Sequence, residues 1–326
     1  MELRRVQVTR GGTFFISLPK EWAEKNGLKR SSVVATSEAA DGRLFIDPRY
    51  DVERIPSTVV IKPSPHLERE IIGKYLLGYD IIRIEAKDRI RLEEREKVKK
   101  TSSRLVSLEI VEEDYSKITL QCLLGPSALS PEKVMRREQS ISLSMHKDAV
   151  TALIDGDAHL AKNVIDRDDE VDRQYFLLVR ILRTIVQNPS LSENLGVHPI
   201  DCLDYRQAAS LIESIGDLSS QIAEHTSQLK GLKIGEVSSE PLLRLHKIVY
   251  EAHQESVISF LSHNITMAES IREGRASFEE TFKEAESAFN AQPADLAPYL
   301  LSAVSLIGRI YDHTIDISDL TMPKTI

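Results

Sequence analysis

The chain has 326 residues, 41% of them hydrophobic, which is enough to bury the cores of two or three domains. The net charge of −8 excludes a generic nucleic-acid binder, and two distant cysteines exclude a disulfide framework or a thiolate metal site. No apolar run reaches the ~18 residues that span a bilayer, and the N-terminus lacks the apolar core of a signal peptide. We therefore expect a cytoplasmic protein without membrane insertion.

Residues 1–50 differ in charge from the rest of the chain. They hold nine basic and six acidic side chains, a net charge of +3, which leaves −11 for the remainder. Strand patterns occupy 5–9, 13–17, 32–36 and 43–46, with expected turns at 11–12 and 40–42. A short helix should begin at Pro19 and end at Asn26 and Gly27. A basic segment on an acidic body indicates contact with nucleic acid.

Residues 51–125 predict a small α+β domain. Strands at 58–62 and 80–85 should flank a helix over 67–77. A charged helix over 89–100 then precedes a hairpin formed by 105–111 and 117–124. This β-α-β-α-β-β order contains no functional motif, so the role of the segment stays open.

Residues 126–326 predict an all-α domain. A helix should start at Pro131, and breaks are expected at 166–168, 188–199, 231–240 and 291–294, the first of which would start a helix at Asp168. A weak internal repeat aligns 215–224 with 310–319 and 160–165 with 267–272. Residues of about 130–230 and 238–322 therefore each indicate three helices. The expected domains are 1–50, 51–125 and 126–326.

Two acidic couplets are the main candidate site. Asp168 and Asp172 lie four residues apart in one helical stretch, and Glu213 and Asp217 do so in the next. Like charges at this spacing cost roughly 0.2–0.5 kcal/mol. A solvated acidic face is one interpretation. Four carboxylates from two neighbouring helices also resemble a site for a hard cation or iron, although no Glu-x-x-His motif of the di-iron oxygenases is present, and spacing alone does not decide between the two interpretations.

The second repeat offers fewer ligands. Asp312 keeps the last carboxylate, but Gly308 stands in place of the glutamate and Arg275 near the place of the first aspartate. Arginine cannot bind a metal, so we expect one good site.

His146 and His159 lack a second ligand at helical spacing and are expected to be surface or hydrogen-bonded residues. His246 and His253 are seven residues apart and could share a helix face, but without a partner at i+4 they are weak candidates for a site. The sequence predicts no catalytic residue.

The helical half resembles the PhoU family of phosphate-uptake regulators. The resemblance covers about residues 130–322 and is carried by the runs 160–178 and 211–217. It implies two three-helix repeats whose Glu/Asp-x-x-x-Asp motifs bind iron or zinc. The implied ligands here are Asp168, Asp172, Glu213 and Asp217.

Residues 3–50 resemble a swapped-hairpin domain of the AbrB/MazE type. The run 10–22, the helix stop at 26–28 and the closing 41–46 carry the resemblance, with Leu18 in place of the usual isoleucine. It implies an obligate homodimer that binds DNA through basic residues of the first strands and turn. The candidates are Arg4, Arg5, Arg10 and Lys20. The combination of domains resembles archaeal PhoU-like transcriptional regulators.

The leading hypothesis is a dimeric, phosphate-responsive transcriptional regulator. Its fold would be multidomain: a small N-terminal β swapped-hairpin barrel, a middle α+β unit and a C-terminal all-α PhoU-like domain of two three-helix repeats. The alternative is an adaptor without DNA binding that regulates a phosphate transporter ATPase or a sensor kinase by protein contact. A carboxylate-bridged metalloenzyme is a third hypothesis.

Overall fold

The computed structural model describes residues 2–38, 42–48, 56–125, 128–229, 234 and 236–323. Contacts within it divide the chain into two compact units, Met1–Ile55 and Pro56–Ile326. The α+β and helical segments share the second unit. Most of the turn expected at 40–42 and part of the break expected at 231–240 fall outside the described residues.

The first unit consists of two hairpins and a short helix. Strand β1 (Gln7–Val8) pairs antiparallel with β2 (Phe14–Phe15), and β3 (Ala35–Glu38) pairs with β4 (Leu44–Asp47). Helix α1 (Lys20–Lys25) lies between the hairpins and follows Pro19, as the sequence predicts. After α1, the left-handed residue Gly27 allows the N–H of Leu28 to donate to the carbonyl of Ala23.

None of the side chains described in this unit is buried. Its apolar side chains are instead largely exposed, from 46% for Ile16 to 84% for Leu3, and they include Val6, Val8, Phe14, Phe15, Val33, Leu44 and Phe45. The described residues of one copy of this unit therefore form no hydrophobic core of their own.

The α+β segment follows the predicted order. Its elements are β5 (Thr58–Ile61), α2 (Leu67–Leu76), β6 (Ile81–Glu85), α3 (Leu92–Ser103), β7 (Leu108–Glu113) and β8 (Lys117–Cys122). They form a sheet of order β5-β6-β8-β7, in which β5 and β6 are parallel and the other pairs antiparallel. The helices and the sheet bury a core that includes Ile71, Tyr75, Ile82, Val98 and Leu120.

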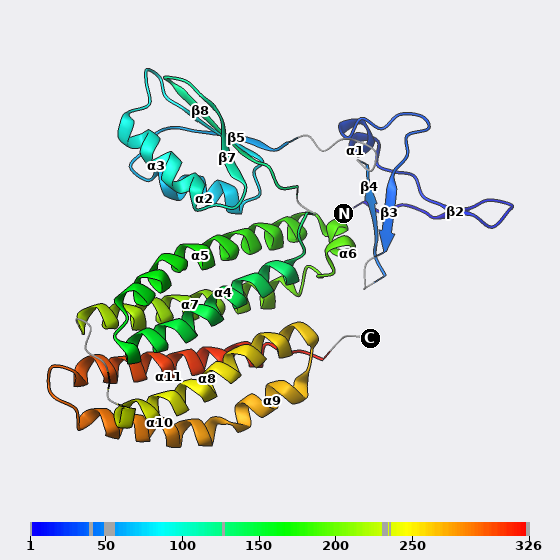
Figure 1. The fold of residues 1–326 in the computed structure, drawn as a ribbon. Helices are drawn as coiled ribbons and strands as arrows, with labels where there is room; N and C mark the ends of the chain where they lie inside the picture. Colours follow the sequence, from blue (N-terminus) through cyan, green and yellow to red (C-terminus); the bar gives the residue numbers. More distant parts are fainter. Residues whose placement is uncertain are drawn as a thin grey trace. The chain divides into compact units, whose positions relative to one another are not determined.

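The helical segment contains two sets of helices (Figure 1). The first set is α4 (Pro131–Asp155), α5 (Ala158–Gln187) and α7 (Cys202–Gln228), with η1 (Pro189–Leu191) and α6 (Ser192–Leu195) in the connection before α7. The second set is α8 (Glu236–Ser262), α9 (Ile265–Glu273), α10 (Arg275–Asn290) and α11 (Ala297–Asp319). One core runs through both sets, and α2 contacts α5.

The break expected at residues 166–168 is wrong, because α5 is continuous from 158 to 187. The chain turns earlier, where Gly156 adopts a left-handed conformation and the Asp157 carboxylate caps α5. Val164 and Val171 are both buried and continue one apolar stripe through the acidic run. Burial of that stripe outweighs the weak helix propensity of aspartate. Asp168 therefore lies inside a helix.

Within the described ranges, no helix combines the length and the apolarity that crossing a bilayer requires.

Candidate functional site

The carboxylate site lies where α5 and α7 approach closely. Gly216 makes this approach possible, because a Cβ atom at that position would lie 3.4 Å from Cγ1 of Val171. The contact sets Asp168 and Asp172 of α5 beside Glu213 and Asp217 of α7. Asp217 is exposed, whereas the other three are partly buried. The structure therefore brings both predicted couplets to one face of the first repeat.

The four carboxylates influence one another electrostatically. Burial, together with the negative charges of Asp217, Asp172 and Asp168, raises the pKa of Glu213 to about 7. Burial and the neighbouring Asp217, Asp172 and Asp169 raise the pKa of Asp168 to about 6, against a weaker opposite effect of Arg104. Partly desolvated oxygens with excess negative charge suit a hard cation.

Arg104, the residue that follows α3, is a cation already bound at this face. Its Nη2 lies 2.8 Å from Oδ2 of Asp172, and its Nε lies 3.3 Å from Oδ1 of Asp169. Its Nη1 lies 3.3 Å from Oε1 of Glu68 on α2. With the side chains in these positions, no group of three or more His, Cys, Asp or Glu residues in the described part of the chain is arranged to hold a metal ion. The donor chemistry fits a metal, but binding would require the side chains to move.

Glu138 on α4 is a further carboxyl group that the sequence analysis did not identify. It is fully buried, and neither oxygen has a hydrogen-bond partner among the described residues. Burial raises its pKa well above the usual range, and Glu213 and Asp172 add to this effect. Burial therefore disfavours the charged form of this carboxyl group. The sequence signal that could have indicated burial of Glu138 is its spacing of four residues from the apolar Val134, which places both on one face of α4.

Three histidines meet in the core between α4 and α8. The ring centroids of His146 and His246 are 4.8 Å apart, and those of His146 and His253 are 5.9 Å apart. His146 and His253 are fully buried, and both ring nitrogens of His253 lack a hydrogen-bond partner among the described residues. The exposed His159 fits the expectation of a surface histidine, and the buried His146 is hydrogen-bonded, with its Nε2 3.3 Å from Nδ1 of His246. Spacing could not predict this cluster, because it joins helices of different repeats.

The corresponding face of the second repeat contains its own cation. Nε of Arg275 lies 3.2 Å from Oε1 of Glu279, and its Nη2 lies 3.8 Å from Oδ1 of Asp312. A Cβ atom at Gly308 would lie 2.8 Å from Cε2 of Phe282, so no glutamate side chain fits there without a shift. An arginine stands in this face where the first repeat has an aspartate.

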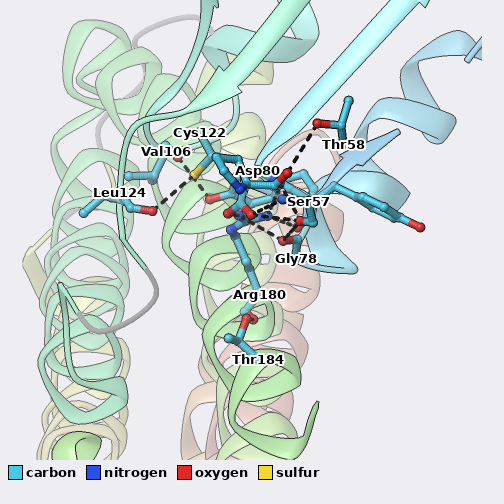
Figure 2. Close-up of polar contacts among 12 residues, drawn as sticks. Ser57, Thr58, Gly78, Asp80, Val106, Cys122, Leu124, Arg180 and Thr184 are labelled. Carbon is cyan, nitrogen blue, oxygen red and sulfur yellow. Dashed lines mark hydrogen bonds and ion pairs between the residues drawn. The ribbon is translucent and has the colours of Figure 1, made fainter. Parts of the chain in front are cut away.

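Arg180 joins α5 to the α+β segment (Figure 2). Its Nη1 donates to the carbonyl oxygens of Tyr75 and Tyr79 at 2.6 and 2.9 Å. Its Nη2 lies 3.5 Å from Oδ1 of Asp80, whose Oδ2 accepts from the Ser57 hydroxyl at 2.9 Å. The guanidinium is buried, so the helix that carries Asp168 and Asp172 is firmly attached to the sheet.

The four basic candidates of the first unit differ in their surroundings. Arg4 forms an ion pair with Glu2 at 2.5 Å, and Lys20 lies 3.8 Å from Glu24 on α1. Arg5 is exposed just before β1, and Arg10 is exposed in the turn between β1 and β2. Arg5 and Arg10 are thus the better placed of the four to contact phosphate.

Comparison with known proteins agrees with the helical fold. The PhoU domain matches residues 135–226, and no curated protein matches the chain. The crystal structure of PhoU from Pseudomonas aeruginosa is similar with 20% identity and a TM-score of 0.53, over 59% of this chain and 93% of that one. The phosphate transport system regulatory protein PhoU from Streptococcus pneumoniae has 18% identity and a TM-score of 0.50, over 59% and 91%. Residues 135–226 thus match the PhoU domain, and the two solved structures share the fold of the helical segment.

Proposed function

We propose that this protein is a homodimeric cytoplasmic regulator of phosphate uptake that binds DNA through its first unit and a metal ion through its first helical repeat. The coupled carboxylates on the α5–α7 face carry this proposal, because they lie within the segment that matches the PhoU domain. Both similar crystal structures are PhoU proteins, and one is named a phosphate transport regulator. This similarity supports the proposed regulatory role in phosphate uptake.

The metal would be held by Asp168, Asp172, Glu213 and Asp217. Iron or zinc is the proposed ion, and its positive charge would offset the burial and the repulsion that together raise the pKa of Glu213. Elemental analysis of protein purified without chelators tests this assignment. Bound metal should fall in Asp172→Asn and Glu213→Gln, with Asp312→Asn of the second repeat as the matched control. Equal metal content in all four proteins would refute the site.

Homodimerisation is proposed from the exposed apolar residues of the first unit. Phe14 is 72% exposed and Leu44 is 62% exposed, in a unit without a buried side chain among those described. A second copy could cover these residues and complete a core. Sedimentation of the full chain should give a dimer, which Phe14→Asp dissociates. Tyr115→Asp, at an aromatic residue of the second unit that is 74% exposed, should leave the dimer intact. A wild-type monomer at micromolar concentration would contradict the proposal.

DNA binding is proposed for Arg4, Arg5, Arg10 and Lys20. A dimer presents each side chain twice, so losing one removes two phosphate contacts and should lower the slope of log affinity against log salt by about 2. Binding to the upstream DNA of its own gene, measured at several salt concentrations, should show this change for Arg5→Ala and Arg10→Ala. Lys133→Ala, an exposed basic residue of α4, is the control. Salt-independent binding, or no loss in either variant, would contradict DNA contact.

An adaptor that does not bind DNA is the second candidate. The ion pairs of Arg4 with Glu2 and of Lys20 with Glu24 favour it, because they neutralise two of the four candidate DNA contacts. The first unit would then serve only to dimerise. Recovery of a phosphate transporter ATPase or a sensor kinase with the purified protein, together with absence of DNA binding, would select this function.

A further inference from the structure

We propose that Arg104 is a displaceable internal cation, which a metal ion releases when it binds the carboxylate site. This inference rests on the proposed metal function and deepens it. It also gives the α+β segment a role, since that segment supplies Arg104 to a site on α5.

The contacts of Arg104 are suited to release. It bonds well to only one carboxylate of the proposed site, Asp172, through Nη2 at 2.8 Å. Its Nε is buried without a hydrogen-bond partner among the described residues, and its contact with Asp169 is an ion pair at 3.3 Å. The third contact, with Glu68, holds the guanidinium on the side of its own segment. If Asp172 were lost as a partner, Arg104 would still have the carboxylate of Glu68, which lies within the α+β segment.

One guanidinium does not balance the charge of the site. Of the four carboxylates of the proposed site, only Asp172 forms an ion pair with Arg104 among the described residues. The buried Glu138 of α4 adds two carboxyl oxygens without a hydrogen-bond partner among the described residues. A multivalent ion can bind several of these oxygens directly, and its charge exceeds that of an arginine. It can therefore compete with Arg104 for Asp172.

The second repeat provides an internal comparison. There Arg275 pairs with Glu279 and Asp312, all within that repeat. The close contact of Gly308 with Phe282 leaves no room for another ligand. Both repeats thus place an arginine against the carboxylates of this face. The arginine of the first repeat differs because it comes from another segment, so its release would be transmitted to α3 and the sheet.

Arg180 and Arg104 would then have different roles. Arg180 is buried and donates to several carbonyl oxygens, so it remains attached in both states. Arg104 is partly exposed and depends on Asp172. Metal binding would loosen the end of α3 from α5 while the attachment at Arg180 persists.

Zinc titration of the chelator-stripped full chain tests this inference, with Arg104→Gln as the variant. Removal of the competing charge should tighten Zn²⁺ binding by about two- to fivefold, the upper part of the range for a partly exposed ion pair. Lys100→Gln removes a nearby exposed charge from α3 and should leave the affinity within about twofold. Hydrogen exchange at residues 100–105 should rise when Zn²⁺ is added to wild type. In Arg104→Gln it should be high already and insensitive to Zn²⁺.

Two other results would overturn the inference. Weaker zinc binding in Arg104→Gln would make Arg104 a residue that orients Asp172 for the metal, and unchanged affinity would show that it does not compete. If wild type binds Zn²⁺ and Glu213→Gln does not, either result leaves the proposed metal site standing. If wild type binds no Zn²⁺, both the site and this inference are wrong.

Discussion

Substitution of His253 should change how the stability of the helical segment depends on pH. Burial lowers the pKa of His253 to about 3, and burial with the nearby charge of Lys147 lowers that of His246 to about 4. Burial and the other two histidines lower the pKa of His146 well below its usual range. The folded protein therefore keeps all three imidazoles neutral at mildly acidic pH, whereas the unfolded chain takes up protons near pH 6.5.

The sign of the effect follows from these pKa values. Above about pH 6.5 the buried neutral imidazoles do not lower the stability of the fold. As the pH falls from there toward the folded pKa values, the unfolded chain binds protons that the folded protein does not, and stability is lost. Keeping His253 neutral costs about 2 kcal/mol at pH 5 relative to pH 7, and His246 and His146 add to this loss. Asp168 and Glu213 act in the opposite direction, because their folded pKa values are raised. A comparison of variant with wild type removes this background.

His253→Leu is the informative variant, because leucine fills a similar volume and removes two buried nitrogens without partners among the described residues. Urea unfolding followed by helical circular dichroism, with a chelator present, should give the free energy of unfolding at pH 7 and pH 5. Between pH 7 and pH 5, the free energy of unfolding should fall by about 2 kcal/mol less in the variant than in wild type. The exposed His159→Leu should follow wild type. Parallel curves for His253→Leu and wild type would refute the reasoning.

Two further predictions concern packing. Arg180→Ala should destabilise the second unit by about 3 kcal/mol, because it removes a buried guanidinium from its carbonyl and carboxylate partners, while the exposed Arg183→Ala should change urea unfolding little. Equal midpoints for the two would contradict the attachment. Gly308→Ala should cost about 1–3 kcal/mol because its Cβ meets Phe282, and Phe282→Leu in the same chain should recover part of this loss. Gly73→Ala, whose Cβ meets nothing within 4 Å, should instead stabilise by about 0.5–1 kcal/mol in the same assay.

Local signals were sufficient to predict most secondary-structure elements. The α+β segment has the predicted order because its strands and helices differ in apolar periodicity, which depends on near neighbours in the chain. Helix α4 begins at Pro131, where Ser130 caps it, and α1 ends at Asn26 and Gly27 for equally local reasons. The helix stop expected at residue 166 failed because it ignored the burial of Val164 and Val171, which only the packed repeat decides.

The sequence by itself determined the two couplets, since a spacing of four residues places carboxylates on one face of any helix. It also determined that the second repeat has fewer carboxylate ligands, because Gly308 and Arg275 stand where the first repeat has acidic residues. Only the tertiary structure decided what surrounds the first site. Arg104 reaches Asp172 across 68 residues, and His246 meets His146 across 100 residues. Such contacts depend on which faces of distant elements pack together, and no local pattern of residues encodes that choice.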